Sequence, residues 1–352
     1  MDLWSPSHKW AKHPDKSPAE APADLITPHD EHLPEHHDHD EHHDEHRDQP
    51  LTIAAAIVMW FTVLLPYIAV IGMIAWTATL PLGWLTLVGF AISYLLIGFG
   101  VTIGYHRLLA HRAFNTYTPI EAAFLVLGCM AMQGPPIRWA ANHRRHHQKS
   151  DQEGDPHSPH LAGNGVRGVV LGLWHAHSGW LLTPDKPNTD RSVKDLLRSR
   201  LITTIDRLYW LWLLISVAVP FGIGFGVTGK LLGGAIAVFW AVVVRIALMH
   251  HATWSVNSIC HFFGYQSYKS GDHSRNNPIV AVISLGEGWH NNHHAFPTSA
   301  RHGLQWFEVD LSWIVIWTLE TLRLAWDVRR PSASARSIKA ATSAPTPAAA
   351  AV

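Results

Sequence analysis

The sequence predicts an all-α integral membrane protein, with four transmembrane helices and a cytoplasmic helical cap that carries a histidine-rich dimetal site. Three observations predict this class. Only 15% of the 352 residues are charged, well below the roughly 25% of soluble domains. Four long apolar stretches each have the length needed to cross a bilayer. Histidines gather in three clusters beside those stretches.

The four apolar stretches are separated by turns or by charged segments. The first covers 51–77 and contains no charged residue; at ~1.5 Å per residue it reaches roughly 40 Å, enough to cross a ~30 Å hydrocarbon core. We expect the other three at 84–105, 208–227 and 231–249. The run 120–132 is too short to span, so we expect it to lie buried against other helices or at the membrane interface.

Basic residues indicate how the bundle is oriented. The segment 106–207 holds 13 Lys and Arg, whereas the loop between the third and fourth stretches holds only Lys230. By the positive-inside rule we expect the long segment, both termini and all three histidine clusters on the cytoplasmic side. The formal net charge is zero and there is no basic stripe, so no nucleic-acid partner is indicated.

Polar sequence flanks the membrane domain, which we predict over 51–328. Residues 1–50 are expected to form a disordered tail, because 28–49 hold eight histidines and nine acids with almost nothing apolar. These irregularly spaced histidines could chelate metal loosely, or they belong to an ordinary solvated acidic tail. Residues 329–352 are rich in Ala, Ser and Pro and are expected to be a second disordered tail.

The three histidine clusters read HRLLAH, HRRHH and HNNHH. On a helix, positions i, i+3 and i+4 share one face, so the second and third clusters can each present three ring nitrogens in one direction. Neutral imidazole binds divalent iron, zinc, copper or nickel, and several convergent rings can hold more than one ion. The candidate ligands are His106, His111, His143, His146, His147, His290, His293 and His294.

A longer pattern contains these clusters. In chain order it reads GYHRLLAHRAF, QGPPIRWAANHRRHHQKSDQEGDPHSP, HSGWLL, ATWSVNSICHFFG and GEGWHNNHHAFPTSARHGL. The pattern resembles the membrane fatty-acid desaturases of the delta-9 acyl-CoA and acyl-lipid (stearoyl-CoA desaturase-like) type, over roughly residues 50–325. Three histidine boxes and an NxxxH motif among four spans make this resemblance highly specific.

The resemblance implies an O2-dependent fatty-acid desaturase with a non-haem centre of two iron ions. Its ligands would be the eight clustered histidines together with His261, and Asn257 would act through a bridging water. The expected reaction inserts a cis double bond, at C9–C10, into a saturated C16 or C18 chain carried as acyl-CoA or acyl-lipid. The sequence has no Rossmann fingerprint or fused cytochrome b5, so the electrons are expected from an external ferredoxin, rubredoxin or cytochrome b5.

Two other functions fit parts of the pattern. A fatty-acyl hydroxylase, or a desaturase of other regiochemistry, would use the same scaffold and metal site. A divalent-metal transporter is a remote alternative. Transporters often carry carboxylates within the membrane, and the four stretches contain no Asp or Glu.

The resemblance also extends to residues near the boxes. It implies that Gln133, Trp139, Thr253 and Trp254 line the bend of an acyl tunnel, although ordinary aromatic packing is the alternative for each Trp. Asp155 is expected to orient a ligand imidazole through a hydrogen bond.

Further basic and histidine side chains lie close to the boxes. Arg138, Arg144, Arg145 and Lys149 could grip a phosphate-bearing carrier or headgroup, or serve as membrane-surface anchors. His250 is expected at the interface, and His302 outside the metal site.

Overall fold

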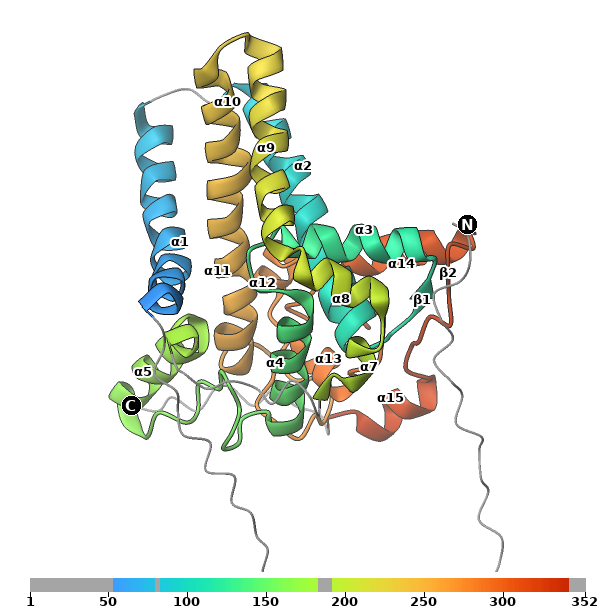
Figure 1. The fold of residues 1–352 in the computed structure, drawn as a ribbon. Coiled ribbons are helices and arrows are strands. Elements are labelled where there is room, and N and C mark those ends of the chain that lie inside the picture. The colour runs from blue at the N-terminus through green and yellow to red at the C-terminus, as the bar shows by residue number, and fades with distance from the viewer. Residues whose placement is uncertain (1–52, 80–82, 183–191, 342–352) are drawn as a thin grey trace, which may run out of the picture. The chain divides into compact units, whose positions relative to one another are not determined.

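The computed structural model describes residues 53–79, 83–182 and 192–341 (Figure 1). Within these residues the regular structure is helical, apart from one pair of two-residue strands and isolated bridges. Four of the helical stretches are long and apolar enough to cross a membrane. The predicted all-α fold with four spans is therefore confirmed. The expected tail at 1–50 lies outside the described residues.

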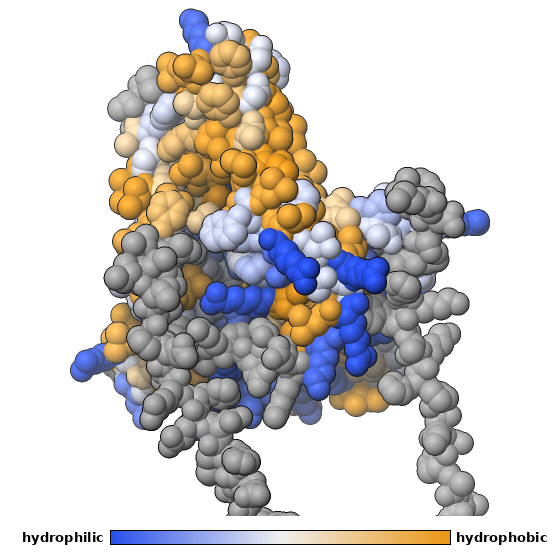
Figure 2. All heavy atoms as spheres, viewed as in Figure 1, coloured by the Kyte–Doolittle hydropathy of each residue, from blue (hydrophilic) through white to orange (hydrophobic). Residues whose placement is uncertain are grey.

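The membrane spans pack side by side in the upper part of Figure 1. Figure 2 shows mainly apolar residues on the surface of this part. The side chains of Ile71 and Trp84 are 67% and 70% exposed, as expected for groups that face lipid. The spans are Trp60–Thr77 in α1 (Ile53–Thr79); α2 (Trp84–Phe99) with η1 (Gly100–Ala110); α9 (Tyr209–Thr228); and α10 (Leu231–Val238) with η3 (Phe239–Val244), α11 (Arg245–Ser258) and η4 (Ile259–His261).

Two spans extend further than the apolar pattern predicts. The helical stretches continue past the expected span ends at 105 and 249, to Ala110 and His261. Hydropathy falls where the histidines begin, yet neighbouring elements bury these side chains, so the helix continues. His250, expected at the interface, is likewise buried. The last stretch has 31 residues, or roughly 46 Å, so its end projects beyond a ~30 Å hydrocarbon core.

Two shorter apolar helices, α3 (Thr118–Cys129) and α14 (Leu311–Thr321), run across the direction of the spans (Figure 1). Helix α3 packs closely on η1, because a Cβ atom at Gly100 would lie 2.3 Å from the Gly128 amide nitrogen. Only glycine permits this approach. The prediction that the run 120–132 packs against other helices is confirmed.

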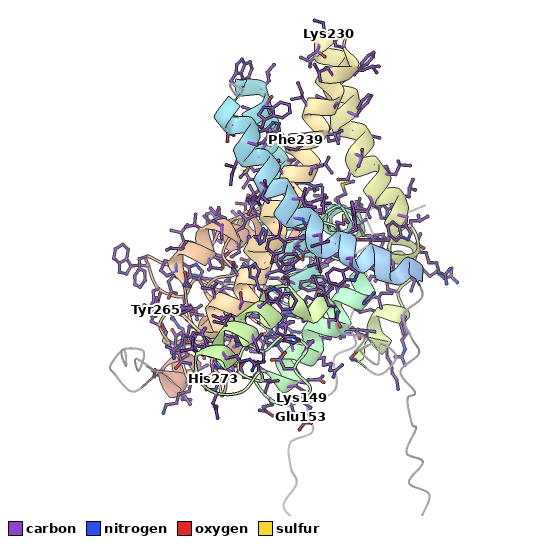
Figure 3. The ribbon with its side chains drawn as sticks, turned by 90° about the vertical axis from the view of Figure 1, so that its left-hand side faces the viewer. Lys149, Glu153, Lys230, Phe239, Tyr265 and His273 are labelled. Atoms are coloured by element: carbon purple, nitrogen blue, oxygen red, sulfur yellow. The ribbon has the colours of Figure 1, made fainter. Side chains whose placement is uncertain are left out.

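The polar end of the structure is built from short helices and loops. Lys149 and Glu153 lie at this end, and Lys230 lies at the opposite end of the bundle (Figure 3). Proline opens both α4 and α12, where its missing N–H costs no helical hydrogen bond. The helices are α4 (Pro136–Lys149), α5 (Gly165–His177), η2 (Gly179–Leu182), α7 (Lys194–Leu197), α8 (Arg200–Arg207), α12 (Pro278–Ile283) and α13 (His290–Ala295).

The chain after α14 returns to the polar end. Strand β2 (Ala325–Trp326) pairs antiparallel with β1 (Asn115–Thr116), and α15 (Ala333–Lys339) follows. The Lys339 ammonium donates to the Ala295 carbonyl over 2.6 Å. The expectation of a disordered tail from residue 329 is therefore wrong up to residue 341. Composition suggested a tail, but hydrogen bonds to distant loops order this segment.

Candidate metal centre

The first histidine pair lies on a π-helix. His106 belongs to η1 and His111 follows its end, where the His111 amide donates to the His106 carbonyl over 3.1 Å. In an α-helix, residues five apart point about 140° away from each other. The i→i+5 bond of a π-helix instead brings them to one side. Their ring centroids are 4.8 Å apart, so this local geometry lets the H-x4-H spacing aim two imidazoles at one place.

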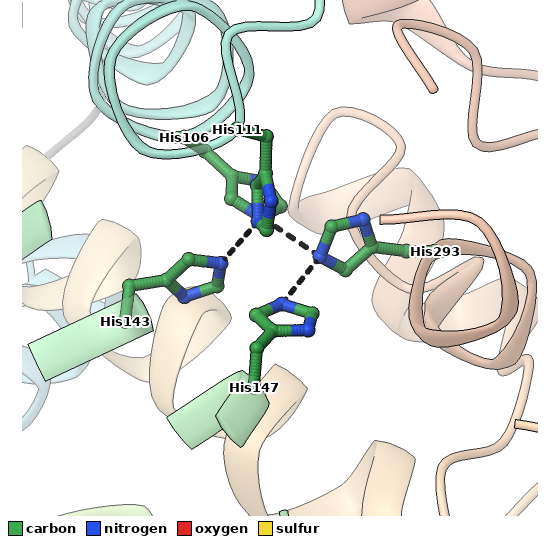
Figure 4. Close-up of side chains that lie close together, drawn as sticks. All are labelled: His106, His111, His143, His147 and His293. Atoms are coloured by element: carbon green, nitrogen blue, oxygen red, sulfur yellow. Dashed lines mark hydrogen bonds between the residues drawn. The ribbon is translucent and has the colours of Figure 1, made fainter. Parts of the chain in front are cut away.

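Five imidazoles converge in a first group (Figure 4). Nε2 of His293 lies 3.0 Å from Nε2 of His106 and 2.9 Å from Nε2 of His147. Nε2 of His111 lies 2.7 Å from Nε2 of His143. The rings come from η1 and the residue that follows it, from α4 and from α13, and their candidate ligand atoms all lie within 4.8 Å of one another. This first group is His106, His111, His143, His147 and His293.

Four buried imidazoles form a second group. Nε2 of His261 lies 3.0 Å from Nε2 of His290. The ring centroid of His294 is 5.1 Å from that of His146. The two groups adjoin, since the centroids of His147 and His294 are 4.4 Å apart. The second group is His146, His261, His290 and His294. The structure thus brings all nine predicted histidine ligands together.

A carboxylate contacts the Nδ1 atom of four of these imidazoles. In the first group, Glu287 lies 2.6 Å from Nδ1 of His106. In the second group the carboxylate–Nδ1 distances are 2.9 Å for Asp155 and His146, 2.9 Å for Asp151 and His261, and 2.6 Å for Asp272 and His294. Each carboxylate accepts a hydrogen bond from Nδ1–H, so the Nε2 lone pair is left to face the interior of its group.

Burial favours the neutral form of six of these rings. It lowers the pKa of His147 and His293 well below the usual range. It also lowers the pKa of His294 to about 4, although the hydrogen bond with Asp272 opposes the shift. At neutral pH each of these rings is therefore neutral and keeps one nitrogen lone pair that can bind a metal ion.

Two buried ring nitrogens that lack a hydrogen-bond partner indicate that the histidine groups suit metal ions. Nε2 of His146 and Nε2 of His294 are buried, with no hydrogen-bond partner among the described residues. Buried polar atoms are rarely left unpaired, and neutral ring nitrogens that converge without a donor suit divalent cations. The nine histidines therefore fit two metal ions, one in each group. The imidazoles alone do not distinguish iron from zinc or copper.

A third cluster of possible ligands adjoins the first group, but a guanidinium already lies within it. His106, Glu287 and His302 approach one another closely enough to hold an ion. Arg107 Nη2, however, lies 3.2 Å from Glu287 and 3.2 Å from Nδ1 of His302. The fully buried Arg107 also pairs with Asp310 at 3.0 Å. Arg107 therefore supplies the positive charge that this cluster requires, and the cluster supports His106 without a further cation.

One of the four predicted tunnel residues, Trp139, contacts the first group, and it forms a hydrogen-bonded chain with Gln133 and Thr253. The Trp139 indole donates to the Gln133 side-chain oxygen over 3.2 Å, and the Gln133 amide donates to the Thr253 hydroxyl over 2.9 Å. Trp139 also stacks on His143, with ring centroids 5.1 Å apart. Trp254 is buried on α11. Asn257 lies half-buried on the last turn of the same helix.

The basic residues near the second box divide into two kinds. Arg138 and Arg145 line a cavity of about 260 Å³ together with His175 and Trp180. Arg144 instead forms a bidentate pair with Asp195, at 2.8 and 3.0 Å. Of the two roles suggested for Arg144, carrier contact and membrane-surface anchoring, its contacts support neither, because its guanidinium is engaged within the protein.

Comparison with known proteins agrees with this geometry. The sequence model of the family described as "Fatty acid desaturase" matches residues 82–313. The chain belongs to the fatty acid desaturase family. The desaturase is 41% identical to the "sn-1 stearoyl-lipid 9-desaturase" of Anabaena variabilis, over 66% of this chain and 79% of that protein. It is 38% identical to the "Delta-9 acyl-lipid desaturase 1" of Arabidopsis thaliana, over 70% and 75% of the two chains.

A relative with a different product is equally similar. The desaturase is 43% identical to the "Hex-5-enoyl-[acyl-carrier protein] acetylenase" of Moorena producens, over 66% of this chain and 74% of that protein. With four candidate spans and this family membership, the protein is a membrane enzyme that desaturates fatty acids. Relatives of this kind act on acyl-lipid or acyl-CoA substrates.

Three supporting carboxylates were not predicted from the sequence. Asp155 was expected beside an imidazole, but Asp151, Asp272 and Glu287 were not singled out. Glu287 lies three residues before His290 in the GEGWH motif, so its proximity to the box was an available signal. Asp272 belongs to a loop 18 residues before the third box, and no spacing rule connects it with His294.

Proposed function

We propose that this desaturase inserts a cis double bond at C9–C10 of a saturated C16 or C18 acyl chain, using O2. The observation that carries the proposal is the convergence of nine histidines into two adjoining groups, at one end of a four-span bundle. Position nine is supported by the delta-9 activities for which the Anabaena and Arabidopsis relatives are named. An acyl-CoA or acyl-lipid is the proposed substrate.

Two iron ions are the proposed cofactor. Their ligands would be the nine histidines, with Asn257 acting through a water. With O2 as the oxidant, iron at this site would supply the oxidation that breaks an unactivated methylene C–H bond, which side-chain acids and bases cannot do. The choice of iron over other imidazole-binding metals rests on the family.

The protein's own residues would orient the ligands and the substrate. The four carboxylates hold Nδ1 of His106, His146, His261 and His294, which fixes the direction of each ring. The buried setting excludes water from the metal groups. The chain of Trp139, Gln133 and Thr253 would position the acyl chain against the first group.

The proposed orientation places the metal centre and both termini in the cytoplasm. It is supported by the 13 Lys and Arg in 106–207 against the single Lys230. Lys230 lies at the end of the bundle opposite Lys149 (Figure 3). An external ferredoxin, rubredoxin or cytochrome b5 would deliver two electrons per double bond from the cytoplasmic side.

Isotope feeding tests the proposed reaction. A host that lacks its own desaturase would express the chain and receive deuterated stearate, and its fatty acids would be analysed by mass spectrometry. We expect labelled oleate with a cis bond at C9–C10, and no product from the His147→Ala control. Accumulation of a hydroxy acid without a monoene would establish the hydroxylase instead. A bond elsewhere would reject position nine alone.

The other two candidate functions are less well supported. A hydroxylase would need the same metal groups, so only the product separates it from a desaturase. A divalent-metal transporter would require ligands along a path through the membrane. The nine histidines instead lie together at the ends of the spans and in the adjoining helices. Uptake of metal by vesicles that contain the purified protein would support transport.

A further inference from the structure

Two buried side chains of α11 hold the turn between α3 and α4. Arg245 Nη1 donates to the Met130 carbonyl over 3.0 Å. Nε2 of His250 donates to the next carbonyl, that of Ala131, also over 3.0 Å. Arg245 Nη2 reaches α9 as well, through the Ser216 hydroxyl at 3.1 Å. Neighbouring carbonyls at the end of α3 are thus bound by one membrane span.

This arrangement is costly for a membrane span. The Arg245 side chain is 1% exposed, and it has no carboxylate partner in the described part of the chain. Its Nε atom has no hydrogen-bond partner there either. A buried guanidinium without a counter-charge destabilises a transmembrane helix, and ionisable groups at such positions usually serve a function. The hydrogen bond from Arg245 to the Met130 carbonyl indicates that this function concerns the turn after α3.

The turn held by Arg245 and His250 carries Gln133. The residue before it, Met132, has a φ of 61°, so the chain reverses sharply between α3 and α4. Gln133 then links Trp139 to Thr253. The ring of His250 also contacts the ring of Trp254, with centroids 5.1 Å apart. Arg245 and His250, here called the clamp, therefore bind the turn that carries Gln133, and His250 also contacts Trp254 directly.

We propose that Arg245 and His250 are positioning residues that determine which carbon pair of the acyl chain faces the first histidine group. They would act through the 130–133 turn, which fixes Gln133 and, through Gln133, the Trp139 ring that stacks on His143. A displacement of about 1 Å in a positioning group changes rates by roughly a hundredfold. A small shift of this turn would therefore move the oxidised position along the chain. The inference rests on the proposed desaturation.

The product test compares substitutions that remove or retain the clamp. His250→Phe and Arg245→Met remove one donor each. His250→Gln keeps a side-chain N–H, and Ser216→Ala removes the other contact of Arg245 without altering the turn. The readouts are double-bond position, from mass spectrometry of derivatised monoenes, and bound iron. We expect the first two variants to give displaced isomers at roughly a tenth or more of product. His250→Gln and Ser216→Ala should keep the wild-type isomer.

A second measurement does not depend on activity. Hydrogen exchange of the amides at 130–134 reports whether the turn is held. Exchange should be roughly tenfold faster in His250→Phe and Arg245→Met, and unchanged in Ser216→Ala. Unchanged exchange would overturn the clamp. Faster exchange with an unaltered isomer in smaller amounts would overturn its role in specificity. If the wild-type enzyme gives a single isomer with its double bond at another position, position nine is rejected but the clamp is not.

Discussion

Removing the carboxylate of Asp272 should weaken one metal site and spare the other. Asp272 lies 2.6 Å from Nδ1 of His294, and both side chains are at least nine-tenths buried. Ser270 and Ser274 donate to the same carboxylate, so its position is fixed. Burial would raise the pKa of Asp272, but the hydrogen bond with His294 holds it below the usual range. The carboxylate is therefore charged at neutral pH.

The size of the effect follows from that contact. Loss of such a support typically lowers metal affinity 10–100-fold, which corresponds to about 1.4–2.8 kcal/mol. A charge-assisted hydrogen bond contributes about 1.5–3 kcal/mol, which agrees. Asp272→Ala should show the full loss. The loss of metal affinity in Asp272→Asn should lie between those of wild type and Asp272→Ala, because the amide oxygen still accepts the hydrogen bond from His294 although the charge is gone.

Chelator titration of the purified, iron-loaded protein measures this effect. We expect wild-type protein to release both ions at high chelator concentration. Asp272→Ala should release one ion per chain at a 10–100-fold lower concentration. The matched control is Glu153→Gln, which neutralises an exposed acid of the same cap. An unaltered titration would refute the assigned support. Equal weakening of both ions would refute the division into two groups.

Three further outcomes are expected. His293→Ala should abolish desaturation and leave membrane insertion intact, because it opens the first group; retained activity in labelled-stearate feeding would contradict the ligand assignment. Arg107→Met should destabilise the protein by about 3–5 kcal/mol, since it removes the positive charge that offsets buried Glu287 and Asp310; thermal unfolding in detergent measures this, and an unchanged midpoint would argue against it. Deletion of 1–48 should leave turnover nearly unchanged in metal-replete medium, and complete loss of product would show that the segment contributes to catalysis.

The spans and the histidine groups were predictable because each has a local signature. Twenty apolar residues without charge have few stable locations other than a bilayer, and i, i+3, i+4 spacing determines the face of a helix. The boxes could thus be assigned to one site. The ends of the spans were not predictable from hydropathy. His250 and Arg245 are polar, yet packing against the turn after α3 buries them inside the bundle.

The support of the metal groups was only partly predictable. Asp155 could be identified because it follows the second box within a short turn. Asp151 and Asp272 reach their imidazoles through loops that bring distant segments together, and a loop has no periodicity to reveal this. The pairing of Arg107 with Asp310 spans about two hundred residues. Such contacts depend on the tertiary fold, and no single stretch of the sequence contains the information.

The π-helix of η1 limits how this gene segment can evolve. Its extra residue per turn sets the phase between His106 and His111. Loss of one codon between them would rotate everything after the deletion by about 100° and shorten the path by ~1.5 Å. Leu108 and Ala110 can be exchanged for residues of similar size without that penalty. In this segment, insertions and deletions should therefore be far rarer than substitutions.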